Sequence, residues 1–348
     1  MSFLENLFSR EKRNESVVLI DIGAESVAGA YAYYKDGESP ALLYTRRLPI
    51  EAREGEPQER AMLRALDVLG RALISEGAPA LARATGSGSI DTILVSVDSP
   101  WQKTSVRTEH LEQETPFVFT KGLVDGLLKK TGNEAPGESF VDESIVGTLL
   151  NGYETRAPYG KKARRADVIV LISAIDESVA THVIKTLRGL YHTKHITPTA
   201  GGSLRYHAMQ KAFPHERDAL IIDAVGQRIS IALVRRGLLV ALVEVPDATS
   251  DSSRAKQVGE TLADLAKRYP LSRTIFLLAR ESDAVFLRTD LVVVNFGRLW
   301  LSNSPPKIVL VLPSVIVGLV RQVSTAPPDL PLLLMALYWL HRAAEDVT

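Results

Sequence analysis

The chain has 348 residues, in which 41 lysines and arginines balance 41 aspartates and glutamates. Proteins that bind nucleic acid usually carry a basic footprint, so this balance argues against nucleic acid as a partner. The sequence contains no cysteine, which excludes a disulfide framework, zinc–thiolate sites, iron–sulfur clusters and thiol nucleophiles. With 45% hydrophobic and 24% charged residues, the composition is that of a globular protein, and the length predicts two or three compact units.

No stretch of the sequence is typical of a membrane span or a secretory signal. The longest apolar run covers 330–340 and has 11 residues, whereas a spanning helix needs about 20. The N-terminal segment lacks the apolar core of a signal peptide. Its apolar residues nevertheless recur at helical spacing, which indicates either a docked terminal helix or a weak anchor to a membrane surface or partner. These residues are Phe3, Leu4, Leu7 and Phe8.

The N-terminal part of the chain alternates between strand-like and helical patterns, which is typical of an α/β architecture. The predicted strands cover 16–22, 27–34, 41–48 and 90–97. A helix is predicted over 57–76, because its apolar residues share one face and Pro57 suits a first turn. Gly77 is predicted to end this helix. The segment 85–89 is predicted to be flexible and not a phosphate loop, because no Gly-Lys-Ser/Thr follows it.

Beyond Trp101 the pattern changes to a mixture of short strands and one helix. The strands are predicted over 144–150 and 168–175, and the helix over 120–131. This mixture indicates a small α+β unit inserted over 101–175. A new helix then begins after Asp176, whose side chain is a good N-cap.

Two segments of the chain resemble each other 202 residues apart. The segments 19–27 and 221–229 each consist of an apolar strand that ends in an aspartate, a tight turn and the start of another strand. A repeated supersecondary unit indicates two related halves, which would place the two aspartate turns on opposite sides of a cleft. Chance similarity between two strand–turn–strand units is the alternative interpretation.

The first of these turns has the residue types of a phosphate site. Small residues at a hairpin tip let backbone N–H groups approach a phosphate, and an aspartate beside the tip could orient water on a bound Mg²⁺. The candidate phosphate-binding residues are Asp21, Gly23, Ala24, Glu25 and Ser26 in the first turn and Asp223 and Gly226 in the second, with Asp21 as the candidate for Mg²⁺. The second turn meets these requirements less well, because Val225 stands where the first turn has Gly23.

Other candidate sites have weaker support. Four histidines within 24 residues, at positions 192, 195, 207 and 215, match no spacing of a metal site and are interpreted as surface and core residues. The densest basic cluster is Lys161, Lys162, Arg164 and Arg165. This cluster is either a solvated loop or a docking surface for lipid headgroups or an acidic partner.

Taken together, these segments resemble the actin-like ATPase superfamily, and within it the bacterial FtsA and PilM proteins. The segment 19–27 is similar to the first phosphate motif of that family, and 220–226 stands where the second belongs. The resemblance implies an actin-like (ribonuclease H-like) two-lobed α/β fold with a small inserted α+β domain. Its first lobe would comprise 1–100 and 176–212, its inserted SHS2-like domain 101–175, and its second lobe 213–348 with a reduced outer subdomain.

The chain also departs from the family pattern in the second lobe. Family members have paired glycines where the adenosine lies, whereas here the strand 274–278 runs into Ala279 and Arg280. The short stretch between Pro246 and Thr274 leaves little room for the outer subdomain, and Val225 weakens the second phosphate turn. We therefore expect weak or lost ATP binding, with ATP and Mg²⁺ as cofactors only if the cleft is functional.

The function implied by the resemblance is assembly and not efficient catalysis. FtsA links the division machinery to the membrane, and PilM organises the base of type IV pili. The expected partners are therefore proteins of the division or pilus machinery, with membrane-surface contact and homo-oligomerisation as further options. The expected location is cytoplasmic, at the inner face of the membrane. The alternative is a working actin-like ATPase or sugar-kinase-type enzyme of the same fold.

Overall fold

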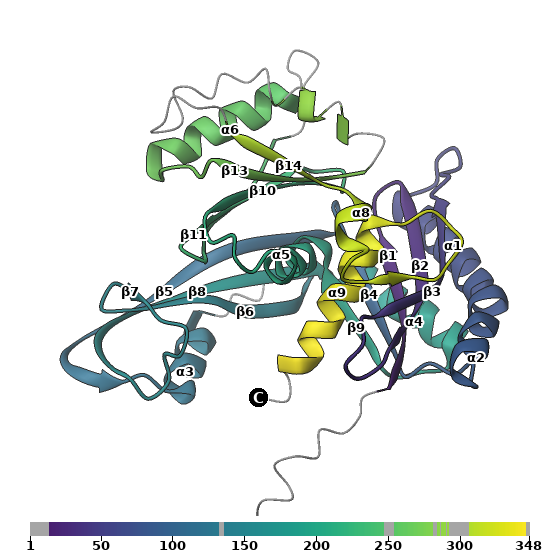
Figure 1. Ribbon diagram of the computed structural model, residues 1–348, viewed down its shortest axis with the longest axis horizontal. Coiled ribbons are helices and arrows are strands. Elements are labelled where there is room, and N and C mark those ends of the chain that lie inside the picture. The colour runs from purple at the N-terminus through teal and green to yellow at the C-terminus, as the bar shows by residue number, and fades with distance from the viewer. Residues whose placement is uncertain are drawn as a thin grey trace, which may run out of the picture.

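A computed structural model of the protein describes residues 14–131, 136–246, 254–280, 284–285, 287–289, 291 and 306–345. The described chain folds around three β-sheets, two of which form the centres of separate lobes (Figure 1). Within these residues, no helix is both long and apolar enough to cross a membrane.

The sheet of the first lobe has six strands in the order β15-β3-β2-β1-β4-β9. Their bounds are β1 Glu15–Ile22, β2 Ser26–Tyr34, β3 Ala41–Pro49, β4 Thr92–Val97, β9 Ile196–Ala200 and β15 Arg321–Gln322. Strand β1 pairs antiparallel with β2 and parallel with β4, and all its residues are buried. Burial on both faces explains its continuous run of Val, Leu and Ile. The four strands predicted in this part of the chain are confirmed.

The sheet of the second lobe has five strands in the order β12-β11-β10-β13-β14. Their bounds are β10 Ala219–Ala224, β11 Ser230–Arg235, β12 Leu238–Glu244, β13 Thr274–Ala279 and β14 Lys307–Val311. As in the first lobe, two antiparallel hairpins are followed by two parallel additions. Because the two sheets share this order, the predicted relation between 19–27 and 221–229 is structural and not a chance similarity.

The helices of the first lobe are α1 Gln58–Ala72, α2 Ala78–Thr85 and α4 Glu177–Tyr191. The prediction that the first helix ends at Gly77 is wrong, because the chain continues through a π-helical turn, Leu73–Gly77, into α2. The helix ends at Gly86, which has the left-handed conformation (φ +83°) of a C-terminal cap. Gly77 serves packing instead, since a Cβ there would lie 2.4 Å from the Tyr31 ring. Asp176 caps α4 as predicted, accepting a hydrogen bond from the Val179 amide.

A separate four-stranded sheet, in the order β5-β8-β6-β7, forms between β4 and α4. We call residues 102–176, with this sheet and its helix, the inserted module. Its elements are β5 Gln102–Val118, α3 Lys121–Thr131, β6 Glu138–Leu150, β7 Tyr153–Glu154 and β8 Lys162–Asp176. Strands β6 and β8 are 13 and 15 residues long, which is longer than predicted. The prediction was too short because the ends of these strands carry charged side chains on the solvent face and lack an apolar run. Figure 1 shows the module extending away from both lobes.

The end of the chain returns to the first lobe. After β14 come α8 Pro313–Ile316, β15 and α9 Leu330–Glu345. Strand β15 pairs with β3, and α9 contacts β1, β2 and α5, which spans Gly201–Ala212. The predicted second lobe, 213–348, is therefore wrong beyond about residue 313. The physical reason is that the apolar residues of α9 cover most of its circumference over 330–339, where every residue is buried, and they pack on β1, β2 and α5.

Between β12 and β13, the described chain contains a single helix, α6 Arg254–Arg268, while residues 247–253 lie outside the described part. Helix α6 packs its apolar residues on the outer face of the second sheet. The main core of the protein joins the inner faces of both sheets through α5 and α9. This shared core positions the ends of β1, β4 and β10 close to one another.

Candidate functional site at the cleft between the lobes

Three buried aspartates lie where the two lobes meet. Asp21 lies in β1, Asp98 directly follows β4, and Asp223 lies in β10. These three residues expose 3%, 3% and 7% of their surface, respectively. A Cβ added to Gly226 of the second turn would lie 3.8 Å from the Asp98 carboxyl carbon of the first lobe. The two aspartate turns therefore face each other, as the internal similarity predicts.

Arg205 on α5 joins two of these aspartates across the cleft. Its Nη1 and Nη2 donate to the two carboxylate oxygens of Asp98 at 3.0 and 2.7 Å. Its Nε donates to Asp223 Oδ2 at 2.6 Å. The Arg205 side chain is only 6% exposed, so this guanidinium holds both lobes together inside the protein.

A second arginine occupies the first phosphate turn. Arg47 on β3 donates from Nη2 to Asp21 Oδ2 at 2.9 Å and from Nη1 to Ser26 Oγ at 2.8 Å. It also forms an ion pair with Asp329, just before α9, at 2.7 Å. Asp21 and Ser26, both predicted as phosphate or Mg²⁺ contacts, therefore bond to the protein itself.

The charges of this cluster depend strongly on burial. Burial raises the pKa of Asp21 to about 6, although the Arg47 guanidinium opposes the shift. Burial also raises the pKa of Asp223, against the effect of Arg205. Burial alone would lower the pKa of Arg205, but Asp223 and Asp98 outweigh it, and the pKa lies above its ordinary value. Both arginines therefore stay charged. They lie beside Asp21 and Asp223, whose carboxyl groups are harder to ionise because they are buried.

This arrangement does not fit a bound Mg²⁺. The ion takes oxygen ligands from one or two carboxylates and several waters, whereas guanidinium groups bond four carboxylate oxygens of Asp21, Asp98 and Asp223. Asp21 Oδ1 is buried and has no hydrogen-bond partner in the described chain, but one oxygen is no coordination site. In the described residues, no group of histidines, aspartates and glutamates could hold a metal ion, and this includes the four histidines at 192, 195, 207 and 215.

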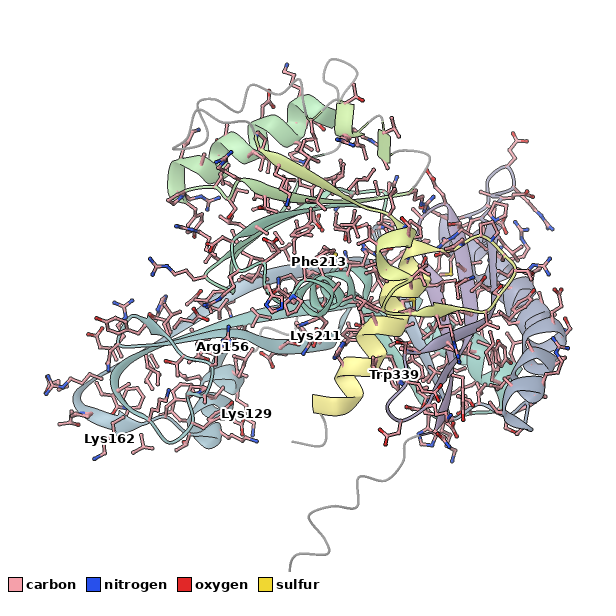
Figure 2. All side chains as sticks on the ribbon, in the orientation of Figure 1. Lys129, Arg156, Lys162, Lys211, Phe213 and Trp339 are labelled. Carbon is pink, nitrogen blue, oxygen red and sulfur yellow. The ribbon has the colours of Figure 1, made fainter. Side chains whose placement is uncertain are left out.

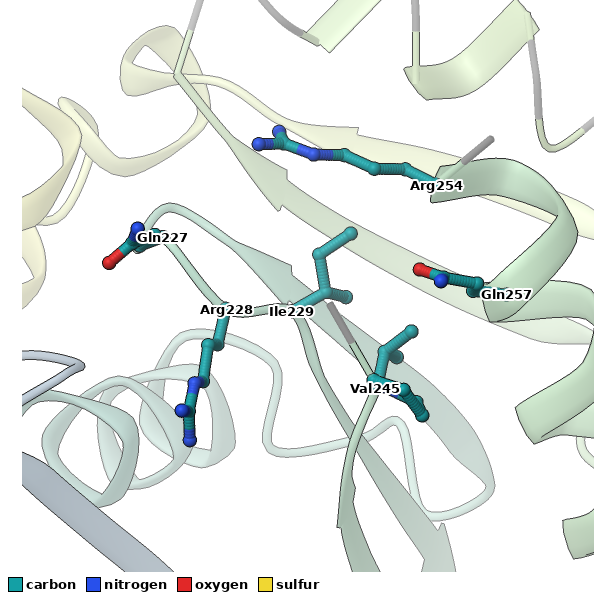
Figure 3. A pocket seen from close by; sticks show the side chains of 7 residues that line it. Gln227, Arg228, Ile229, Val245, Arg254 and Gln257 are labelled. Carbon is teal, nitrogen blue, oxygen red and sulfur yellow. The ribbon is translucent and has the colours of Figure 1, made fainter. Parts of the chain in front are cut away.

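The tips of the two turns keep a small polar cavity of about 240 Å³. Ala24 and Glu25 line it from the first lobe, and Gly226, Arg254 and Arg280 are among its second-lobe residues. A neighbouring cavity of about 230 Å³ shares Arg254 and Gln227 with it, and Figure 3 shows the Arg254 side chain extended along this opening. Each cavity is smaller than the roughly 300–1,000 Å³ of pockets that hold drug-sized ligands.

Arg280, which the sequence places at the expected adenosine surface, reaches across the cleft toward the first turn. It follows β13, and its Nη1 lies 3.6 Å from Glu25 Oε2 across the cleft. In the second turn, the Val225 amide donates to Asp223 Oδ1 at 3.1 Å, so that this N–H is bonded within the turn. In the first turn, the Gly23 amide donates to the Ser26 carbonyl. A Cβ at Gly23 would make only ordinary contacts, so the turn does not require glycine there.

The sequence analysis missed Arg205, Arg47 and Asp98. Asp98 carried a recognisable signal, because β4 ends in an aspartate as β1 does. The two arginines carried none, since their roles depend on contacts with residues more than a hundred positions away, Arg205 with Asp98 and Arg47 with Asp329.

The predicted docking residues lie far from the cleft. Lys161, Lys162, Arg164 and Arg165 are exposed around the start of β8, and Figure 2 shows Lys162 at the far end of the inserted module. Arg165 forms an ion pair with Asp167. The N-terminal candidates Phe3, Leu4, Leu7 and Phe8 lie outside the described residues.

The fold is similar to that of solved structures with distant sequences. A chain of a PilM–PilN type IV pilus biogenesis complex aligns over 93% of this chain and 98% of its own, with a TM-score of 0.53 and 15% identity. A Bacteroides thetaiotaomicron protein with an actin-like ATPase fold and unknown function aligns over 92% and 95%, with a TM-score of 0.47 and 11% identity. For an exopolyphosphatase from Cytophaga hutchinsonii the coverages are 95% and 90%, with a TM-score of 0.39 and 10% identity.

No protein-family model and no curated protein matches this sequence. The strand order and the PilM alignment agree on the fold class. The protein has an actin-like α/β fold with two lobes, as the sequence analysis predicts.

Proposed function

We propose that this protein is an actin-like assembly protein whose nucleotide cleft no longer binds Mg-ATP with useful affinity. The observation that carries this proposal is the bridge from Arg205 to Asp98 and Asp223. The guanidinium stands in the cleft between Asp98 and Asp223, and Asp223 is the candidate phosphate-site residue of the second turn. The protein thus neutralises its own cleft.

The size of the effect follows from the burial of the bridge. A nucleotide that reached these carboxylates through Mg²⁺ would have to break a buried ion pair, which costs about 3–5 kcal/mol. Since about 1.4 kcal/mol changes an affinity tenfold, the bridge weakens Mg-ATP binding by roughly two to three and a half orders of magnitude. Arg280 adds a steric obstacle beside the first turn.

The assembly role draws support from the inserted module. The module places Tyr153 and Tyr159, which are 78% and 45% exposed, near the basic cluster at 161–165. Exposed aromatic side chains with flanking cations are typical of surfaces that bind partner proteins. The whole-chain likeness to a protein solved in a pilus biogenesis complex favours a partner of the pilus-assembly kind over one of the division kind.

On this proposal the protein works at the cytoplasmic face of the membrane, where its partner holds it. The module corresponds by position to the SHS2-like domain that the resemblance implies. The basic cluster provides the docking surface, either to an acidic segment of the partner or to lipid headgroups beside it.

Isothermal titration with Mg-ATP tests the cleft. We expect a Kd for Mg-ATP of about 0.1 mM or weaker, because an ATP site with a Kd of about 1 μM would be weakened by the factor derived above. Micromolar binding would overturn the proposal and favour the working ATPase.

Affinity purification from the source organism tests the assembly role. The wild-type chain is compared with a variant in which Lys161, Lys162, Arg164 and Arg165 are all glutamine. A control variant, Lys185→Gln with Arg188→Gln, removes two exposed cations from α4 of the first lobe. Recovery of a pilus or division component by the wild type and the control, but not by the module variant, supports the proposal. Recovery of neither class of protein contradicts it.

A further inference from the structure

A polar cavity of about 230 Å³ lies away from the cleft, where the inserted module meets α5 and α9. We call it the junction cavity. Strand β6 contributes Asp142 and Ser144, helix α5 contributes His207 and Lys211, and helix α9 contributes Tyr338, His341 and Arg342. Figure 2 shows Lys211 on α5 between the inserted sheet and α9.

Regular spacing aims these side chains at one place. Residues two apart on a strand share a face, as Asp142 and Ser144 do. Residues four apart on a helix also share a face, which holds for His207 with Lys211 and for Tyr338 with Arg342. Three elements therefore turn polar faces toward the same cavity, and none of these residues belongs to the cleft.

The lining of the junction cavity is rich in positive charge and hydrogen-bond donors. Lys211 and Arg342 bring cationic groups to the lining, and two imidazoles and two hydroxyls accompany them. Among the described lining residues, the carboxylate is that of Asp142, which accepts hydrogen bonds from Ser144 and from Ser203. Burial raises the pKa of Asp142, but its contacts with His207, Ser144 and Ser203 outweigh burial and lower it. Two cationic side chains and one carboxylate therefore line the cavity in the described chain.

One donor in the lining lacks a hydrogen bond. His207 Nε2 is buried without a hydrogen-bond partner in the described chain. Its distance to Asp142 Oδ2 is 3.7 Å, which is longer than a hydrogen bond. The ring lies beside those of Tyr206 and Tyr338, at centroid distances of 5.4 and 6.2 Å, which limits its freedom to turn away. A buried polar atom without a partner costs free energy unless a ligand supplies one.

We propose that the junction cavity binds a phosphate group, either free phosphate or the phosphate of a lipid headgroup. Lys211 and Arg342 supply the charge, and His207 and the hydroxyl of Tyr338 complete the hydrogen bonds. Basic side chains with several converging donors recognise phosphate in this way. The volume is below the roughly 300–1,000 Å³ of pockets for drug-sized ligands, so the ligand is smaller than a nucleotide.

The junction cavity lies where phosphate binding would affect how the inserted module is attached to the first lobe. A phosphate held by β6, α5 and α9 would fasten the inserted module to the first lobe and to the last helix. A ligand that binds the folded state raises the stability of the parts it connects. Phosphate would therefore stiffen the joint through which the module presents its surface.

Calorimetry and thermal unfolding with inorganic phosphate test this proposal, with sodium chloride at equal ionic strength as reference. We expect saturable binding of phosphate and a rise in Tm that chloride does not reproduce. Lys211→Gln and Arg342→Gln should each weaken binding by roughly tenfold or more, since each removes a charge-assisted contact. Lys185→Gln, an exposed position on α4 of the first lobe, should bind phosphate like the wild type.

Circular dichroism establishes that each variant is folded before binding is compared. Lys211 is exposed, so its replacement keeps the test meaningful even if Arg342→Gln unfolds the end of α9. A Tm that responds equally to phosphate and chloride would overturn the proposal. Equal phosphate affinity in Lys211→Gln and in the wild type would overturn it as well.

Vesicles that contain phosphatidic acid distinguish the two sources of a phosphate group. Binding of inorganic phosphate without vesicle binding identifies a soluble ligand. Vesicle binding that Lys211→Gln abolishes identifies a lipid headgroup, and both results support a phosphate site. Absence of binding in both assays rejects it.

Discussion

Arg205→Met tests the central feature of the cleft, because it removes the guanidinium and keeps a long side chain. In the intact protein the side chains of Asp98 and Asp223 are 4% and 9% exposed, and Arg205 bonds both. The variant leaves two buried carboxylates without their shared cation. Loss of one partner from a buried ion pair costs about 3–5 kcal/mol, so we expect a loss of stability of this size.

Thermal unfolding measures the loss. For domains of about 150–250 residues, 1 kcal/mol corresponds to about 2–4 °C, so the Tm should fall by roughly 6–20 °C, with the lower half of that range expected for this longer chain. The matched control is the triple variant Arg205→Met, Asp98→Asn and Asp223→Asn. Because replacement of a whole buried ion cluster by neutral groups is often close to neutral in stability, the triple variant should recover more than half of the loss.

Two results would refute this reasoning. A Tm of Arg205→Met within about 2 °C of the wild type would mean that the bridge contributes less than about 1 kcal/mol. A triple variant no more stable than Arg205→Met would mean that the loss came from packing and not from the stranded charges.

Three further predictions concern the same cleft. Because the pKa of Asp21 is about 6 in the folded protein and 3.8 ordinarily, the folded state binds this proton more tightly, and stability should fall as pH rises from about 4 to 6. At about 1.4 kcal/mol per pKa unit the fall is about 3 kcal/mol. In Asp21→Asn, the unfolding free energy from urea titrations should change less with pH between about 4 and 6. An unchanged pH dependence would mean that other groups cause the fall in stability. Gly201→Ala should lower stability by about 1–3 kcal/mol, because the new Cβ would lie 2.1 Å from Asp98 Oδ1. Gly23→Ala, whose Cβ would make no contact shorter than 3.4 Å, should change stability by less than about 1 kcal/mol; equal Tm losses in the two glycine variants would contradict the geometry. Arg280→Ala breaks an ion pair with Glu25, which is 78% exposed, so it should cost less than about 1 kcal/mol. It should also leave calorimetric Mg-ATP binding as weak as in the wild type, and micromolar affinity in this variant would mean that Arg280, and not Arg205, closes the cleft.

Features that depend on neighbouring residues in the chain were predictable. The strands β1, β2 and β4 are recognisable as largely apolar runs, because a strand buried on both faces needs apolar side chains at nearly every position. The two aspartate turns could be matched because each half carries its own copy of the strand–turn–strand unit. Asp176 was recognisable as a helix cap for the same local reason.

Features that depend on distant contacts were not predictable. Gly77 looks like a helix stop in the sequence, and only the Tyr31 ring packed against it shows that the glycine serves close packing instead. The polar ends of β6 and β8 look like loops until their partner strand is known. The return of α9 to the first lobe needed the position of β1, which lies about three hundred residues earlier.

The class of fold, the two similar halves and the aspartates of the two turns, Asp21 and Asp223, are readable from the amino-acid sequence, because period and residue type act over short stretches of chain. What these two aspartates do depends on the tertiary structure. Whether a carboxylate holds a metal or a guanidinium depends on which side chain another part of the chain brings within about 3 Å of it, and here Arg47 and Arg205 occupy that place.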